Sequence, residues 1–189
     1  MTEAPLKILT ILGSTREGRF GETVANWFNG IADAREDFQN LPVDLRDINL
    51  PFLSAPGTQP EDYDIERWRE LVGGADGFVV ITPEYNHSIP AVLKNAIDHL
   101  NKEWNNKPMA VVSYGGGAGG SRAAEHLRLI AIELQMAPIR EGIHIVMARL
   151  NFDEHGQPKD PAMNGRVDTV LTQLAWWARA LRAARNAEM

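Results

Sequence analysis

In the stretch ILGSTREGRFGETVANWF, residues 11–28, an apolar run changes into a polar loop and then into a helical pattern. Residues 7–12 are apolar except for Lys7 and Thr10, which is typical of a strand covered on both faces. Residues 21–34 carry apolar side chains at helical spacing, at Val24, Ala25, Phe28, Ile31 and Ala32. The stretch therefore predicts a strand, a loop rich in polar residues and a helix in direct succession.

The same alternation of strand and helix continues along the chain. We expect further strands at residues 43–48, 77–82, 108–114 and 139–146, and helices at residues 63–72, 89–100, 119–136 and 167–185. The proline-rich residues 50–60 predict a loop. This alternation favours an α/β fold in which helices cover both faces of one parallel sheet. The length of 189 residues fits a single domain, residues 1–189.

Five strands in such a sheet most often take the order 2-1-3-4-5, and the ligand then lies beyond the carboxyl ends of the strands. This rule predicts that the loops after the first, third and fourth strands carry the chemistry. We name these the first loop (residues 13–20), the second loop (residues 83–88) and the third loop (residues 115–120).

The composition excludes several classes of function. A formal net charge of −6 argues against nucleic acid or an anionic membrane as a partner. The absence of cysteine excludes disulfides, thiolate metal sites and a cysteine nucleophile, and it suits the cytoplasm. The opening residues MTEAPLKILT lack the apolar core of a signal peptide, and no apolar run reaches the roughly 18 residues that span a bilayer. We therefore expect a cytoplasmic protein with no membrane or nucleic-acid partner and no metal site.

The first loop has the composition of an anion site at the start of a helix. Its hydroxyl and guanidinium donors are Ser14, Thr15, Arg16 and Arg19. Backbone N–H groups at a helix start, together with arginine, suit a phosphate group. Thr15 stands where a dinucleotide fingerprint has its middle glycine, and no Gly-Lys-Ser/Thr follows, so the pattern favours a phosphate monoester. The alternative is a capped helix start with solvated arginines, whose charge Glu17 and Glu22 offset.

The second loop is stiff and aromatic. Pro83 and Pro90 bracket an aromatic ring, an amide and a hydroxyl. Such a loop at the carboxyl edge of a sheet suits a flat heteroaromatic ligand, which needs a stacking wall and in-plane hydrogen bonds. The alternative is a tight turn in which Asn86 and Ser88 cap the next helix. His87 has no identifiable carboxylate partner, and we do not predict a catalytic role for it.

The third loop contains five glycines in six positions, after the strand that ends in SY and before the next helix. Glycine removes side chains and lets backbone amides approach a ligand closely. Because the loop has no lysine, it suits the polar edge of a ring better than a phosphate. The alternative is a flexible linker.

These three loops, in this order, resemble a flavodoxin-like FMN site. GSTREGR, PEYNHSIPAVLKNAIDHL and SYGGGAGGSRAAEHLR are similar to the NAD(P)H-dependent FMN reductase family, which includes quinone, chromate and azo-dye reductases. The resemblance covers nearly the whole chain, and PEYN followed by LKNAID is its most specific part. It implies a flavodoxin-like three-layer sandwich, FMN as cofactor and NADPH or NADH as co-substrate.

The resemblance also implies which residues bind FMN. The phosphate would be bound by Ser14 and Arg16 with the backbone around Arg19, Phe20 and Gly21. The isoalloxazine ring would be bound by Pro83, Glu84, Tyr85, Asn86, Ser113, Gly115, Gly116 and Gly117. Many relatives have serine and asparagine at the positions of Arg19 and Gly21. Relatives are commonly homodimers or homotetramers, and an interface could involve Lys94, Asn95 and Asp98, although Lys94 and Asp98 also fit an ordinary i,i+4 pair.

The function implied is an NAD(P)H-dependent flavoprotein reductase. FMN would take hydride from NAD(P)H and pass two electrons to a small-molecule acceptor, a quinone, azo dye, metal oxyanion or free flavin, by a ping-pong mechanism. No side chain need act as an acid or base, so no catalytic residue is predicted. The alternatives are a flavodoxin-like electron carrier that does not oxidise pyridine nucleotide, an enzyme of another class using the Glu84 carboxylate, and a binding module without turnover.

Overall fold

A computed structural model describes residues 4–54 and 63–187. Its sheet is parallel, with the order β2-β1-β3-β4-β5, as predicted. The strands are β1 (Leu6–Leu12), β2 (Phe38–Asp44), β3 (Gly77–Pro83), β4 (Pro108–Tyr114) and β5 (Ala137–Ile145). The α-helices are α1 (Gly21–Ala32), α2 (Ile65–Gly73), α3 (Ala91–Asp98), α4 (Ser121–Glu133), α5 (Ala148–Asn151) and α6 (Ala162–Ala187). Two short 3₁₀ helices are η1 (Leu45–Asp47) and η2 (Lys102–Trp104).

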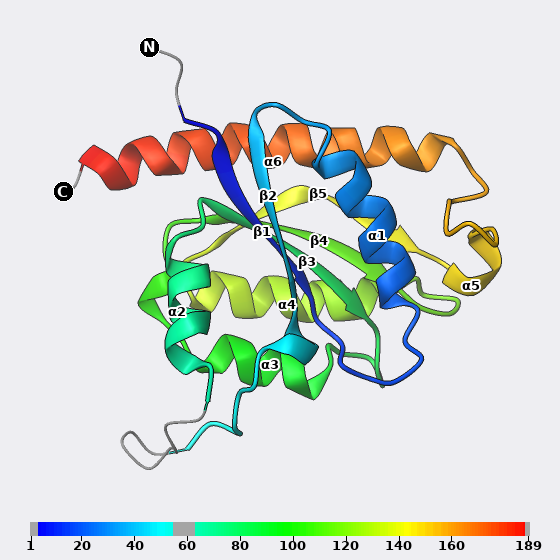
Figure 1. Cartoon of the computed structure of the whole chain (residues 1–189), viewed down its shortest axis with the longest axis horizontal. Helices are drawn as coiled ribbons and strands as arrows, with labels where there is room; N and C mark the ends of the chain where they lie inside the picture. Colours follow the sequence, from blue (N-terminus) through cyan, green and yellow to red (C-terminus); the bar gives the residue numbers. More distant parts are fainter. Residues whose placement is uncertain (1–3, 55–62, 188–189) are drawn as a thin grey trace.

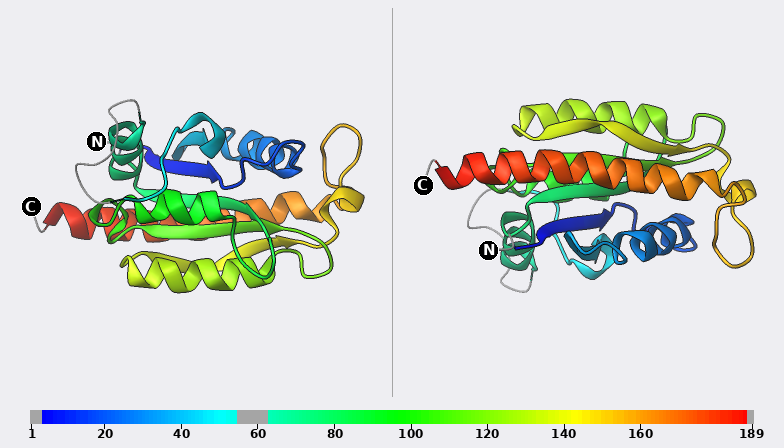
Figure 2. Two further views of the ribbon diagram at one scale, coloured as in Figure 1. Left: turned by 90° about the horizontal axis from the view of Figure 1, so that it is seen from below. Right: turned by 90° about the horizontal axis from the view of Figure 1, so that it is seen from above.

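The helices form a layer on each side of the sheet. Helices α1 and α6 cover one face, and α2, α3 and α4 cover the other (Figure 1). Figure 2 shows α6 in front of the strands from above, and α3 in front from below. Successive strand residues point to opposite layers, so Ile8 packs with the α1 and α6 side and Leu9 with the other. Two hydrophobic cores therefore sandwich the sheet, as the α/β prediction requires.

The second strand lies earlier in the chain than predicted. We expected it at residues 43–48, whereas β2 ends at Asp44 and residues 45–47 form η1. The Asp44 side chain accepts a hydrogen bond of 2.9 Å from the backbone N–H of Arg46, which stabilises this turn. β2 is an edge strand, and it tolerates Pro42 and polar side chains that hid its pattern.

Several helix ends also differ from the sequence expectation. α6 begins five residues before the predicted residue 167, and α5 was not predicted. α3 begins after Pro90, which is its N-cap residue, and α4 is shorter at both ends than residues 119–136. Residues 55–60 of the predicted proline-rich loop lie outside the described residues. Such boundaries are the least determined part of a local pattern.

The topology brings the three predicted loops together. Because β1, β3 and β4 are parallel neighbours, the loops that follow them meet at one edge of the sheet. The backbone N–H of Gly13 donates to the carbonyl of Ile81 at 2.9 Å, which ties the first loop to the end of β3. Within residues 4–54 and 63–187, no helix combines the length and apolarity needed to cross a membrane.

Lys107 is buried at the opposite end of the sheet, where it caps α2. Its ammonium donates hydrogen bonds of 2.8 Å to the carbonyls of Val72 and Gly73. Burial, with the nearby charge of Arg185, lowers the pKa of Lys107 from 10.5 to about 8. At pH values between about 8 and 10.5, Lys107 is protonated in the unfolded chain but not in the folded protein. The free energy of unfolding is therefore expected to rise as pH increases through this range.

We expect a rise of about 2 kcal/mol, since one pKa unit corresponds to about 1.4 kcal/mol and the two carbonyl bonds offset part of the burial. The measurement is urea unfolding at about pH 7 and about pH 10.5, on wild type and Lys107→Met. The Lys107→Met variant should lack this rise in the free energy of unfolding. An equal change in the free energy of unfolding between the two pH values in both proteins would contradict the assignment to Lys107.

Candidate functional site

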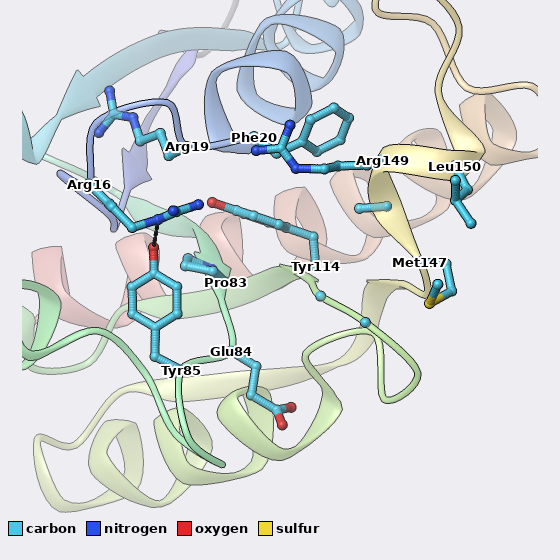
Figure 3. A pocket seen from close by; sticks show the side chains of 13 residues that line it. Arg16, Arg19, Phe20, Pro83, Glu84, Tyr85, Tyr114, Met147, Arg149 and Leu150 are labelled. Carbon is cyan, nitrogen blue, oxygen red and sulfur yellow. Dashed lines mark hydrogen bonds between the residues drawn. The ribbon is translucent and has the colours of Figure 1, made fainter.

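A pocket of about 310 Å³ lies at the carboxyl edge of the sheet, and all three predicted loops contribute to it (Figure 3). It is lined by Arg16, Arg19, Phe20, Pro83, Glu84, Tyr85, Tyr114, Gly115, Gly116, Met147, Ala148, Arg149 and Leu150. Its volume is at the lower end of the range of roughly 300–1,000 Å³ usual for small-molecule sites. Eight of the thirteen predicted site residues line it, whereas Ser14, Gly21, Asn86, Ser113 and Gly117 do not.

The first and second loops meet at Tyr85. The Ser14 side chain is buried, and its Oγ lies 2.9 Å from the Tyr85 hydroxyl. Arg16 is exposed, and its Nε donates to the same hydroxyl at 3.2 Å. In the described part of the chain no carboxylate pairs with Arg16. Its positive charge is therefore available to an anion in the pocket.

The start of α1 offers free backbone donors. Phe20 is the N-cap residue, and it makes no side-chain capping bond. Among the described residues, the backbone N–H groups of Phe20, Gly21 and Glu22 have no acceptor. Free N–H groups and the positive end of the helix dipole favour an anion at this position.

Arg19 differs from Arg16, although the sequence presents both as cations of one loop. The Arg19 side chain is 1% exposed and forms ion pairs with Asp44 and Glu22. It also donates to the backbone carbonyl of Ser14. Burial would lower the pKa of Arg19, but the hydrogen bonds and charges of Asp44 and Glu22 raise it. The guanidinium thus stabilises the first loop through its bond to Ser14, and Asp44 and Glu22 neutralise its charge.

The second loop is a tight turn. Tyr85 and Ser88 exchange backbone hydrogen bonds of 2.9 and 3.1 Å, and Asn86 and His87 have φ angles of 48° and 76°. Two successive positive φ values are those of a type I′ turn. The tight turn is present, but Asn86 and Ser88 do not cap α3 as the alternative required, because the N-cap of α3 is Pro90 and has no side-chain bond. Asn86 lies exposed in the turn.

The Glu84 carboxylate turns away from the Arg16 end of the pocket (Figure 3). Arg122 of α4 pairs with it and donates from Nε at 2.6 Å. Burial opposes ionisation of Glu84, but the hydrogen bond and charge of Arg122 outweigh it and lower its pKa. An ionised carboxylate is a poor acid, and its ion pair with Arg122 weakens it as a nucleophile, so the geometry disfavours an enzyme of another class that uses Glu84.

The glycines of the third loop have different structural roles. Gly120 has a φ of 81°, and a Cβ there would lie 2.7 Å from Ser113 Cβ. The backbone N–H of Gly115 donates to the carbonyl of Ile145 at 3.2 Å, so this N–H is unavailable to a ligand. In the described part of the chain the N–H groups of Gly116 and Gly117 have no acceptor, and a Cβ at either would meet nothing within 4 Å. Gly116 and Gly117 therefore combine an available backbone N–H with open space for a ligand.

Ser113 supports this loop from behind and does not face the pocket. Its Oγ donates to the carbonyl of Gly119 at 2.9 Å and lies 2.7 Å from His144 Nδ1. The His144 ring lies on β5, and burial lowers its pKa. Ser113 therefore holds the backbone of the third loop in place.

Sequence reasoning missed five residues that line the pocket. Tyr114 ends β4 directly before the third loop, and its hydroxyl is buried with no hydrogen-bond partner among the described residues. Burial raises the pKa of this hydroxyl, so it stays protonated and can donate. The others follow β5, and they are Met147, Ala148, Arg149 and Leu150. Two sequence signals could have indicated these residues. Tyr114 is an aromatic residue at a strand end, and the other four follow the fifth parallel strand, at the edge of the sheet where ligands bind in such folds.

The comparisons with known proteins agree with the geometry. A model of the family described as NADPH-dependent FMN reductase matches residues 6–148. The chain is 36% identical to an NAD(P)H-dependent FMN reductase of Schizosaccharomyces pombe, over 87% of this chain and 80% of that protein. It is 32% identical to an NAD(P)H:quinone oxidoreductase of Solanum tuberosum, over 97% of each chain.

Among solved structures, the chain is similar to the flavoenzyme NAD(P)H:(acceptor) oxidoreductase of Paracoccus denitrificans. The TM-score is 0.77 at 20% identity, over 93% of this chain and 98% of that one. This likeness confirms the predicted flavodoxin-like fold, and the family match confirms the predicted enzyme class. The chain therefore belongs to the NADPH-dependent FMN reductase family.

Proposed function

We propose that this chain is an NAD(P)H-dependent flavoprotein reductase that binds FMN in the pocket and passes two electrons to a quinone-type acceptor by a ping-pong mechanism. The observation that carries the proposal is one end of the pocket. There, among the described residues, N–H groups of α1 without an acceptor, Arg16 without a carboxylate partner and the Tyr114 hydroxyl without a hydrogen-bond partner lie together. We take residues 1–189 as a single FMN-binding domain.

The phosphate of FMN fits this end of the pocket. Arg16 supplies a guanidinium, and the first turn of α1 supplies N–H donors at Phe20 and Gly21. Ser14 fits as the residue that holds the Tyr85 hydroxyl in place beside Arg16. Tyr114 supplies a donor that nothing else in the described structure satisfies, and a buried polar group without a partner calls for one.

The isoalloxazine ring fits the other end. Pro83 and Tyr85 form a stiff wall, with the backbone of Glu84 between them. The free N–H groups of Gly116 and Gly117 suit the N1/C2 carbonyl edge of the ring, where they would stabilise negative charge by fixed dipoles. Asn86 lies exposed in the adjacent turn, within the same loop as this wall.

When bound, FMN supplies the exchange of a hydride with NAD(P)H and of two electrons with the acceptor. The residues of this chain bind and orient it, and none is required as an acid or base. Met147 and Leu150 are 45% and 62% exposed at the rim, which favours a flat apolar acceptor such as a quinone over a metal oxyanion. Azo dyes and free flavin share this flat apolar shape, and the co-substrate is NADPH or NADH.

We also propose that the active form is a homodimer or homotetramer. Leu129 and Ile132 of α4 are 67% and 62% exposed, and such apolar surface favours an interface. Lys94 pairs with Asp98 at 2.6 Å as an ordinary i,i+4 pair. Asn95 bonds to Pro51 and Leu53, so it orders the segment beside α3.

The deciding experiment is the visible absorption spectrum of the purified protein, recorded under nitrogen before and after NADPH is added. A yellow protein that bleaches supports both FMN binding and hydride transfer. A yellow protein that neither NADPH nor NADH bleaches would favour the electron carrier instead. A protein that stays colourless after FMN is supplied would refute the proposal.

Arg16→Ala is expected to weaken FMN binding by about 1.5–3 kcal/mol, the usual size of a hydrogen bond to a charged group. This corresponds to roughly a ten- to hundredfold higher dissociation constant. The measurement is a titration followed by quenching of flavin fluorescence. Arg140→Ala is the matched control, because the Arg140 side chain is 87% exposed on β5 and lies outside the pocket. Unchanged FMN affinity in Arg16→Ala would remove Arg16 from the phosphate site.

A further inference from the structure

Arg149 lies in α5, one residue beyond the part of the chain that the family model matches. Its guanidinium lies 5.4 Å from the centre of the Phe20 ring, and its Nη2 donates to the carbonyl of Gly18 at 3.0 Å. The Phe20 ring packs edge-on against Phe152 at 5.5 Å, which fixes the ring beneath the guanidinium. Although Arg149 is distant in sequence, it is therefore anchored to the first loop at the start of α1.

The charges around Tyr114 show which end of the pocket Arg149 serves. Burial raises the pKa of the Tyr114 hydroxyl, whereas the nearby charges of Arg16 and Arg149 oppose that rise. Figure 3 shows the guanidinium groups of Arg16 and Arg149 on the side of the pocket where this hydroxyl points. Arg19 lies near as well, but Asp44 and Glu22 neutralise it.

Two positive charges therefore remain at this end. In the described part of the chain neither Arg16 nor Arg149 has a carboxylate partner. Like charges placed together without a counterion repel each other, and a bound anion relieves the repulsion. A phosphate monoester carries about −1.5 to −2 charge near pH 7, which matches two guanidinium groups better than one.

We propose that Arg149 is a second cationic ligand of the flavin phosphate, opposite Arg16, and that it sets the preference of this chain for FMN over riboflavin. The inference rests on the proposed function, because it assigns a further residue to the same site. It gives the loop after β5 a specific role in cofactor selection. Arg149 then differs in role from the neighbouring Met147 and Leu150, which the proposed function assigns to the acceptor.

The test compares dissociation constants for FMN and riboflavin, which differ by the phosphate alone, in wild type and Arg149→Ala. Both are measured by fluorescence quenching, with no turnover required. We expect Arg149→Ala to weaken FMN about tenfold, at the low end for a charge-assisted bond because Arg149 is exposed, and to leave riboflavin within about twofold. Arg149→Lys should recover part of the loss, since it keeps the charge but lacks the fork. Arg140→Ala should change neither constant.

Three outcomes would overturn the assignment. Equal weakening of FMN and riboflavin would mean that Arg149 supports the pocket wall through Phe20. Unchanged FMN affinity, together with a raised KM for NADPH but not for NADH, would assign Arg149 to the phosphate of the nucleotide instead. Unchanged constants for every ligand would leave Arg149 without a binding role. A wild-type protein that binds neither flavin would refute the proposed function itself, and this result is seen before any variant is made.

Discussion

Asp44→Ala is expected to lower the free energy of unfolding by about 3–5 kcal/mol, the usual cost of removing one partner of a buried ion pair. The Arg19 side chain is 1% exposed and Asp44 is its main partner, whereas the second partner, Glu22, is 52% exposed. Without Asp44 the guanidinium remains buried with a weak, solvated counterion. The measurement is urea unfolding of the apoprotein followed by circular dichroism.

Two further variants separate the buried charge from simple loss of a contact. Glu22→Gln should cost under about 1 kcal/mol, because ion pairs to exposed carboxylates contribute little. Arg19→Met combined with Asp44→Leu should recover much of the stability lost in Asp44→Ala, since replacing both partners leaves no unpaired charge. A loss in Asp44→Ala no greater than that in Glu22→Gln would refute the buried-charge argument.

Gly21→Ala is expected to destabilise the protein by about 2–3 kcal/mol, although alanine ordinarily favours a helix. A Cβ at Gly21 would lie 2.4 Å from the Tyr114 hydroxyl oxygen and 2.8 Å from Leu12 Cδ1. Both side chains are buried between α1 and the sheet, so neither can move aside freely. The crowding should also displace Tyr114 and weaken FMN binding, which the same fluorescence titration measures.

The same helix provides the control. A Cβ at Gly30 would meet nothing within 4 Å, so Gly30→Ala should stabilise the protein by about 0.5–1 kcal/mol. Tyr114→Phe should relieve part of the loss in Gly21→Ala. Alone it should leave the apoprotein at least as stable as wild type, because the hydroxyl has no hydrogen-bond partner among the described residues. Additive effects of Gly21→Ala and Tyr114→Phe would contradict the proposed contact.

The positions of the buried strands were predictable because their signals are local, whereas the strand order followed from the order most common in such sheets. The buried strands β1, β3 and β4 have nearly unbroken apolar runs, and each leads into a loop of glycine, proline or hydroxyl residues. β2 was misplaced because it lies at the sheet edge, where one side is exposed and the apolar pattern is weak. Burial on both faces, and not strand formation as such, made β1, β3 and β4 readable.

The candidate site was predictable only in part, for a related reason. Residues that leave backbone atoms open in the pocket, such as Gly116, follow from loop chemistry that a short motif encodes. Tyr114 was missed because the burial of its hydroxyl, without a hydrogen-bond partner in the described part of the chain, is a property of its surroundings that a local sequence pattern does not show. Arg149 was missed because β5 places its loop beside the first loop across more than a hundred residues of sequence.

Local sequence patterns predicted the parallel sheet, the sheet edge that carries the pocket and the three loops there, because strand and helix periods and glycine and proline chemistry act over a few residues. The pairing of the charged side chains, in contrast, depends on tertiary packing. Arg16 and Arg19 stand three residues apart in one loop, yet Asp44, from a distant strand end, neutralises only Arg19. Whether a charge can bind a ligand depends on its partners and its burial, and both are set by packing between segments that the sequence keeps far apart.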